Sequence, residues 1–258
     1  MKKIVTILLT VALFVTATAL GVNSVYRVDT LDLNIRFVSE DAKMEAESLR
    51  AELVDLYEKE SVFTVKQTDA ESVFANYPYF RMTGFKKEYP NKLVIEATED
   101  AEVFSVEKDG EYFVLALDGT VLSIRKTAEN RSDGKPNVTI KGMEISGGKG
   151  EFCVGEKLNA VLPLLKELST RFNGLRSNLV SVEYQLLGGT VEQYNLLTKE
   201  GVVIRVQQVE ELVAEKAEKI TQVYFSLEDD ERLKGSIYAT NGNGKANAVY
   251  YPTDISFE

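Results

Sequence analysis

The chain has 258 residues, carries 30 Lys and Arg against 40 Asp and Glu, and contains no histidine and one cysteine, Cys153. These counts exclude a Ser-His or Cys-His catalytic pair, a Cys/His zinc site and an intramolecular disulfide. The net charge of −10 opposes binding to nucleic acid and to anionic lipid. Most hydrolase mechanisms are thereby excluded, and we expect no cofactor, no metal ligand and no nucleic-acid partner; no residue is singled out as catalytic.

The N-terminal segment over residues 4–26 carries no charge and follows Met1-Lys2-Lys3. Its length is close to the roughly 20 residues that a helix needs to cross a bilayer. Lysines beside a span are retained in the cytoplasm. We therefore expect a short cytoplasmic N-terminus (residues 1–3), a single-pass anchor in the cell membrane (residues 4–26) and an extracytoplasmic remainder. A cleaved signal peptide is the alternative, because Ala17-Thr18-Ala19 fits the small-x-small cleavage pattern.

One strand and two helices are predicted after this segment. Residues 31–38 alternate between apolar and polar side chains with period two, which is typical of a strand. A first helix is expected to begin near Ser39, because this residue can cap a helix and acidic residues follow it. A second helix is expected after residues 61–65, with Asp69 as its cap and Pro78 as its limit.

Two further strands are predicted over residues 80–88 and 92–98. A turn at Tyr89-Pro90-Asn91 joins them, since proline sets φ and asparagine tolerates unusual backbone angles. The resulting order is β-α-α-β-β in about seventy residues, within the usual size of a small domain. We assign this first domain to residues 30–100.

The end of this domain carries a family resemblance. Residues 74–99 resemble the end of the POTRA domain in the FtsQ/DivIB family of bacterial cell-division proteins, whose pattern is a helix end, a strand, a K/R-x-x-P-N-x-L turn, a strand and a Glu. Residues 87–95 and Glu99 match that pattern closely. Two positions depart from it: Asp100 replaces the Arg that commonly follows the Glu, and Val38-Ser39 replaces the Gly-Asn that commonly ends the first strand.

A β-rich domain is expected over residues 101–252, followed by a C-terminal tail over residues 253–258. Residues 112–122 resemble the hairpin that opens the second domain of the same family, and Asp118-Gly119 is a turn signal by itself. The periodicity predicts helices at residues 158–172 and 209–220, and strands at residues 180–185, 192–197 and 202–206.

A terminal β-hairpin is predicted from the Asn-Gly pairs of residues 241–244, which lie between residues 236–239 and 246–251. The last arm is apolar and contains no proline, so it is suited to accept another strand. In the FtsQ/DivIB family the corresponding strand receives a strand of the FtsB/DivIC partner, and an FtsL-like protein is held in the same complex. The resemblance thus implies a partner-binding strand made of Ala246, Asn247, Ala248, Val249, Tyr250 and Tyr251.

Together these patterns predict an α+β protein with an N-terminal transmembrane helix, a POTRA domain and a β-rich domain with two helices and a terminal hairpin. The resemblance implies a non-enzymatic scaffold of the division machinery that binds other bitopic septal proteins. Two other classes stay open. One is a secreted or membrane-anchored binding module unrelated to division. The other is a carboxylate-only enzyme acting on cell-wall glycan, which needs a cleft with two carboxylates about 5–10 Å apart.

Overall fold

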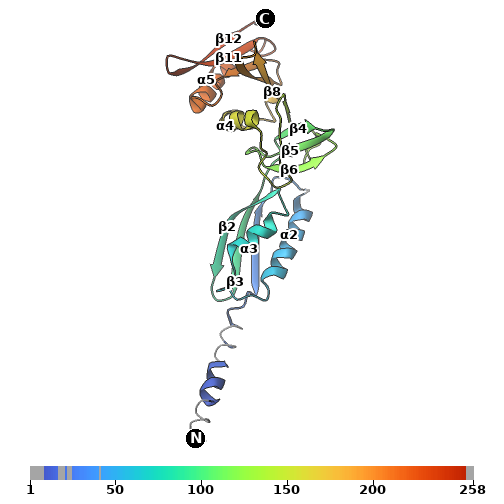
Figure 1. Cartoon of the computed structure of the whole chain (residues 1–258), viewed down its shortest axis with the longest axis vertical. Helices are drawn as coiled ribbons and strands as arrows, with labels where there is room; N and C mark the ends of the chain where they lie inside the picture. The colour runs from blue at the N-terminus through green and yellow to red at the C-terminus, as the bar shows by residue number, and fades with distance from the viewer. Residues whose placement is uncertain (1–8, 17–20, 22–24, 41, 254–258) are drawn as a thin grey trace. The chain divides into compact units, whose positions relative to one another are not determined.

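The computed structural model describes residues 9–16, 21, 25–40 and 42–253 (Figure 1). The fold is α+β, as expected. The chain divides into two compact units, Met1–Asp100 (unit 1) and Ala101–Glu258 (unit 2). Each unit has its own hydrophobic core.

The predicted transmembrane segment falls partly outside the described residues, because residues 4–8, 17–20 and 22–24 are not among them. Residues 9–16 are helical and exposed. Among the described residues, no helix is both long enough and apolar enough to cross a membrane. The spanning helix over residues 4–26 thus stays a prediction.

Unit 1 packs two helices against a three-stranded sheet (Figure 1). Strand β3 lies between the other two strands, parallel to β1 and antiparallel to β2. Because side chains alternate along a strand, Leu93, Ile95 and Ala97 of β3 are all buried, and they share one core with Leu49 and Leu53 of α2. The elements follow the expected β-α-α-β-β order: β1 (Thr30–Arg36), α2 (Ala42–Tyr57), α3 (Gln67–Phe74), β2 (Phe80–Glu88) and β3 (Lys92–Glu99).

The helices of unit 1 begin at residues other than those predicted. Helix α2 begins at Ala42 and not at Ser39. Helix α3 begins at Gln67, and its N-cap residue is Lys66, which makes no side-chain capping hydrogen bond. Asp69 lies instead in the first turn of α3, where a negative charge interacts favourably with the helix dipole.

A buried carboxylate holds the chain at Ser39. Glu99, at the end of β3, is 4% exposed. Its Oε2 accepts hydrogen bonds from the backbone N–H groups of Val38 (2.7 Å) and Ser39 (2.9 Å), and its Oε1 accepts one from the Ser39 hydroxyl (2.6 Å). These charge-assisted bonds, which are stronger than bonds between neutral groups, join the end of β3 to the chain that leaves β1.

We expect Glu99→Gln to lower the free energy of unfolding by about 1.5–3 kcal/mol, the usual contribution of hydrogen bonds to a charged group. The amide keeps one acceptor oxygen, but its NH₂ group faces a donor. Urea denaturation of the purified protein measures the change. Glu96→Gln is the matched control, because Glu96 lies exposed on the other face of β3, and we expect its effect to stay within about 0.5 kcal/mol. Equal losses in both variants would contradict the role of Glu99.

Unit 2 is built on a mixed sheet that, in the described residues, has the strand order β12-β11-β10-β9-β8-β7-β4-β5-β6. The pairs β4–β7, β7–β8 and β10–β11 are parallel. The strands are β4 (Phe104–Lys108), β5 (Glu111–Leu115), β6 (Val121–Arg125), β7 (Val138–Lys141), β8 (Leu179–Leu187), β9 (Val191–Thr198), β10 (Val203–Gln207), β11 (Ser236–Gly242) and β12 (Lys245–Tyr251), and the helices are α4 (Glu156–Arg171) and α5 (Val213–Ser226).

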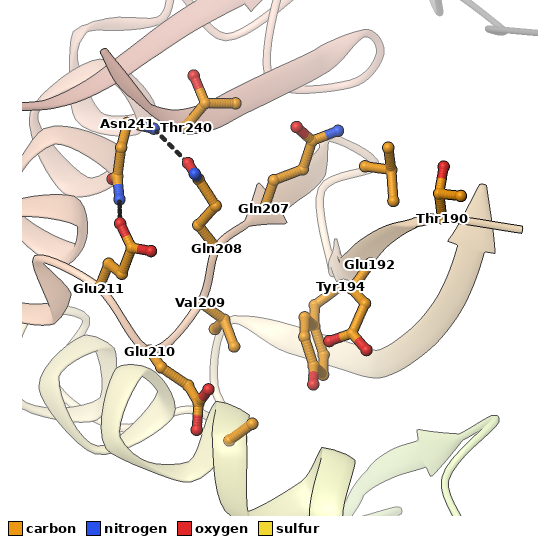
Figure 2. A pocket seen from close by; sticks show the side chains of 12 residues that line it. Thr190, Glu192, Tyr194, Gln207, Gln208, Val209, Glu210, Glu211, Thr240 and Asn241 are labelled. Carbon is orange, nitrogen blue, oxygen red and sulfur yellow. Dashed lines mark hydrogen bonds between the residues drawn. The ribbon is translucent and has the colours of Figure 1, made fainter. Parts of the chain in front are cut away.

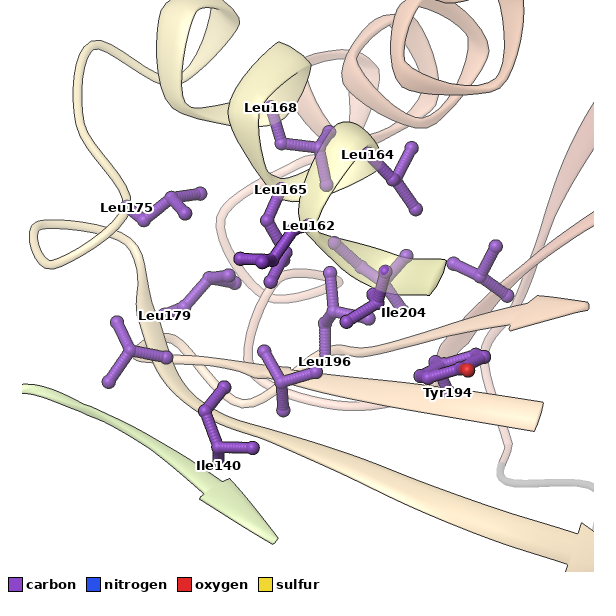
Figure 3. Packing of buried hydrophobic residues seen from close by; sticks show 14 of the residues in the cluster. Ile140, Leu162, Leu164, Leu165, Leu168, Leu175, Leu179, Tyr194, Leu196 and Ile204 are labelled. Atoms are coloured by element: carbon purple, nitrogen blue, oxygen red, sulfur yellow. The ribbon is translucent and has the colours of Figure 1, made fainter. Parts of the chain in front are cut away.

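A row of leucines on α4 forms the centre of the unit 2 core (Figure 3). Leu165 and Leu168 are fully buried and share the cluster with Leu196 of β9 and Ile204 of β10. Helix α5 contacts α4 on one side and both β11 and β12 on the other. The position of the last two strands therefore depends on the packing of α5 as well as on backbone pairing.

Strands β4 and β7 and the start of helix α5 differ from prediction. Strand β4 was not expected, although its first residues, including Phe104 and Val106, are buried. Helix α5 begins at Val213 and excludes Val209 and Leu212, which were expected on its inner face. Leu212 has left-handed backbone angles with φ of 49°, so the chain cannot continue a helix through it.

Candidate functional site

The terminal hairpin is closed by a shorter turn than the four residues predicted. Gly242 pairs with Lys245, so only Asn243 and Gly244 lie in the loop. Both residues have positive φ, 53° and 73°. A two-residue turn with two positive φ angles matches the right-handed twist of the strands that it joins. The turn therefore sets the register between β11 and β12.

Strand β12 forms one edge of the sheet of unit 2 (Figure 1). Its inner side pairs antiparallel with β11 along its whole length, from Lys245 to Tyr251. No strand in the described part of the chain pairs with its outer side. Such an edge presents a row of backbone donors and acceptors to any extended segment that meets it.

The register determines which backbone groups face outward. In a hairpin with a two-residue loop, the residues that flank the loop exchange both hydrogen bonds, and every second pair beyond them does the same. Residues 245, 247, 249 and 251 thus direct their N–H and C=O groups to β11. The N–H and C=O groups of Ala246, Ala248 and Tyr250 point toward the open edge.

The side chains of these same three residues lie on the inner face of the sheet. Ala246 is buried, and Ala248 and Tyr250 pack against the core of unit 2. The Tyr250 hydroxyl lies 3.0 Å from the backbone oxygen of Glu231 and 3.2 Å from that of Lys234. Loss of hydration raises the pKa of Tyr250. Of the two terminal tyrosines, Tyr250 is therefore the inward one.

The outward face of the hairpin carries an exposed apolar strip. Val249 and Tyr251 are both exposed on β12. The ring of Tyr251 meets the ring of Tyr238 edge to face, with centroids 5.3 Å apart. The guanidinium of Arg205 on β10 lies 5.6 Å from the Tyr238 ring centroid. The sequence patterns did not predict the contacts of Tyr238 with Tyr251 and Arg205, because cross-strand neighbours follow from a register that only the structure supplies.

An open groove of about 660 Å³ lies among the ends of β9, β10 and β11 and the loop between β10 and α5 (Figure 2). Three glutamates line it. Glu192 pairs with the Lys157 ammonium at 2.6 Å, and Glu211 accepts a hydrogen bond from the Asn241 amide at 2.7 Å. Glu192, Glu210 and Glu211 are all exposed, unlike the catalytic acid of lysozyme, which lies against an apolar pocket.

A buried lysine holds the loop that borders this groove. Lys216 of α5 is fully buried. Its ammonium donates hydrogen bonds to the backbone oxygens of Gln208 and Glu211. Burial lowers the pKa of Lys216. The periodicity of the sequence carries no signal for this role, since a lysine between Glu215 and Ala217 is ordinary on the surface of a helix.

The single cysteine is a packing residue. Cys153 is fully buried, and burial raises the pKa of its thiol to about 11, so it packs as an apolar residue. Within the described ranges, no group of three or more His, Cys, Asp or Glu side chains is arranged to hold a metal ion.

Comparison with known proteins gives a similarity to a cell division protein. The chain is 21% identical over 193 residues to the cell division protein DivIB of Clostridium botulinum, and the match covers 74% of this chain and 70% of that protein. No family model matches the chain. At this identity the match supports a relationship to DivIB and suggests a role in cell division, and membership of the FtsQ/DivIB family stays a proposal.

We expect Tyr250→Phe to lower the free energy of unfolding by about 1 kcal/mol, because the variant removes one hydrogen bond to a partly buried carbonyl. Tyr251→Phe is the matched control on the exposed face and should stay within about 0.5 kcal/mol of the parent. Urea denaturation measures both. If the Tyr251 variant lost more stability than the Tyr250 variant, the assignment of inner and outer faces would be wrong.

Proposed function

We propose that this protein is a non-enzymatic scaffold of the bacterial division machinery that holds other bitopic septal proteins outside the cytoplasm. The observation that carries the proposal is the similarity to DivIB over most of the chain. The β-α-α-β-β order of unit 1 and the turn at residues 87–93 support it. Residues 30–100 then form a POTRA domain, and residues 101–252 form the β domain of the FtsQ/DivIB type, with residues 253–258 as a tail.

The scaffold is anchored by one transmembrane helix over residues 4–26, with residues 1–3 in the cytoplasm. This part of the proposal rests on the uncharged run and on the two lysines before it. Unit 2, which has a net negative charge, then lies on the extracytoplasmic side of the cell membrane. An anchor of this kind confines the protein to the plane in which other bitopic proteins diffuse.

Partner binding occurs by strand addition to β12. The outward N–H and C=O groups of Ala246, Ala248 and Tyr250 supply the backbone pairing, which gives affinity with little demand on the partner's sequence. Val249 and Tyr251, beside Tyr238, supply an apolar surface for the side chains of the incoming strand. The partners we propose are bitopic coiled-coil proteins of the FtsB/DivIC type, with an FtsL-type protein in the same complex.

The edge-strand mechanism makes two proline variants behave differently. Ala248→Pro removes an N–H that faces the open edge, so we expect it to abolish capture of the FtsB/DivIC-type partner while the urea midpoint changes little. Val249→Pro removes an N–H that pairs with β11, so it should also destabilise unit 2, because proline inside a sheet costs a ladder hydrogen bond. Co-purification of the partner from cells and denaturation of each variant measure the two effects.

Side-chain controls complete that experiment. Tyr251→Lys changes the outward face and should weaken partner capture with a stability change within about 0.5 kcal/mol. Tyr250→Lys buries a charge against the core and should destabilise the fold instead. Full partner capture by a folded Ala248→Pro variant would remove strand addition from the proposal and leave only the similarity to DivIB.

The anchor has its own test. A reporter enzyme that is active only outside the cytoplasm, fused after Glu258, should be active. N-terminal sequencing of the purified protein should find Met1 or Lys2 as the first residue, because the segment is retained. Recovery of a soluble form that starts near residue 20 would show instead that residues 1–19 are a cleaved signal peptide.

A further inference from the structure

Three aromatic rings meet on the surface of unit 1. The ring of Phe63 lies 4.7 Å from that of Tyr26 and 5.2 Å from that of Tyr89, measured between centroids, and Tyr26 and Tyr89 are 6.4 Å apart. Phe63 is 55% exposed and Tyr89 is 60% exposed. None of the three rings belongs to the core cluster of unit 1. The aromatic cluster therefore lies outside the core of unit 1.

The three rings come from three segments that meet at one end of the sheet. Strands β1 and β3 are parallel, and Thr30 pairs with Lys92, so the turn before β3, which holds Tyr89, lies beside the start of β1. The backbone N–H of Asp29 donates to the Asn91 oxygen at 2.9 Å. The aromatic cluster thus lies where the chain enters unit 1 from the N-terminal segment.

The loop after α2 brings Phe63 to the same end. The backbone N–H of Val28 donates to the oxygen of Glu60 at 2.9 Å, and that of Val62 donates to the oxygen of Tyr26 at 2.7 Å. These bonds join Tyr26 and Val28 to the loop. The cluster is held by backbone hydrogen bonds and not only by contacts between its rings.

The charges around the aromatic cluster are mixed. Arg27 donates to the backbone oxygen of Glu58, and the Lys87 ammonium lies 3.4 Å from the backbone oxygen of Phe63. The acidic side chains of Glu58 and Glu60 belong to the same loop. A surface of this composition has no excess of positive charge to attract anionic lipid, so its apolar rings are the feature that a ligand would recognise.

We propose that the aromatic cluster docks into the headgroup region of the bilayer in which the protein is anchored. The proposal rests on the proposed transmembrane anchor: Tyr26 is the last residue of the uncharged run over residues 4–26, which places it at the outer interface when that run spans. Aromatic rings with a polar edge are enriched at this depth. Phe63 and Tyr89, held beside Tyr26, then enter the same layer, and unit 1 keeps a fixed tilt on the membrane surface.

Tryptophan fluorescence tests the docking in the full chain, which has no tryptophan of its own. Tyr89→Trp places a single reporter in the aromatic cluster. Phe37→Trp is the matched control: Phe37 is also exposed, but it lies beyond the far end of β1, about 23 Å of strand from Thr30. Each variant is reconstituted in phosphatidylcholine vesicles, with and without lipids brominated near the headgroup.

We expect the emission of Tyr89→Trp to shift to shorter wavelength in vesicles and to lose intensity with brominated lipid, and that of Phe37→Trp to do neither. Adding Phe63→Lys to the Tyr89→Trp variant should reduce the quenching. Carbonate extraction of the same vesicles tests the anchor separately. A retained Tyr89→Trp chain whose indole emission is unaffected by bromine would overturn the docking and leave the anchor intact, whereas a released chain would overturn both.

Discussion

The register of one hairpin determines what the C-terminal edge of this protein can do. Because Asn243 and Gly244 accept positive φ angles, β12 pairs with β11 so that every second residue turns its backbone outward. A slip of one residue would exchange both the outward backbone groups and the two faces of the strand. Tyr250, whose hydroxyl reaches the oxygens of Glu231 and Lys234, opposes that slip from the inner face.

Unit 1 depends on the same kind of constraint at a different place. Its central strand β3 pairs with both neighbours, and Glu99 at its end holds the chain that leaves β1. At the opposite end of β3, backbone bonds hold the turn at residues 89–91 beside the start of β1 and the loop after α2 beside residues 26–28. One strand therefore positions both the buried carboxylate and the exposed aromatic cluster.

Local patterns predicted most elements of the fold, because alternation in strands such as residues 80–88 and turn signals such as Asn-Gly act over a few residues. Predictions failed at the starts of helices, where a short pattern does not fix the backbone path. Ser39 has the chemistry of a helix cap, but α2 begins at Ala42, and the Ser39 hydroxyl donates to Glu99. Val209 and Leu212 fit the periodicity of α5, but Leu212 turns the chain before the helix starts. The Tyr238–Tyr251 contact and the buried Lys216 depend on register and packing, which no short pattern encodes.

The periodicity of the open edge has a consequence for partner selection. The outward groups of Ala246, Ala248 and Tyr250 repeat every second residue, about 6.7 Å apart. A partner strand displaced by that distance finds nearly the same donors and acceptors, so backbone pairing alone accepts several alignments. Only the outward side chains break this translational symmetry, and Tyr251, braced by Tyr238, is the largest of them on β12. In the proposed complex, backbone pairing thus supports several alignments, and the outward side chains select among them.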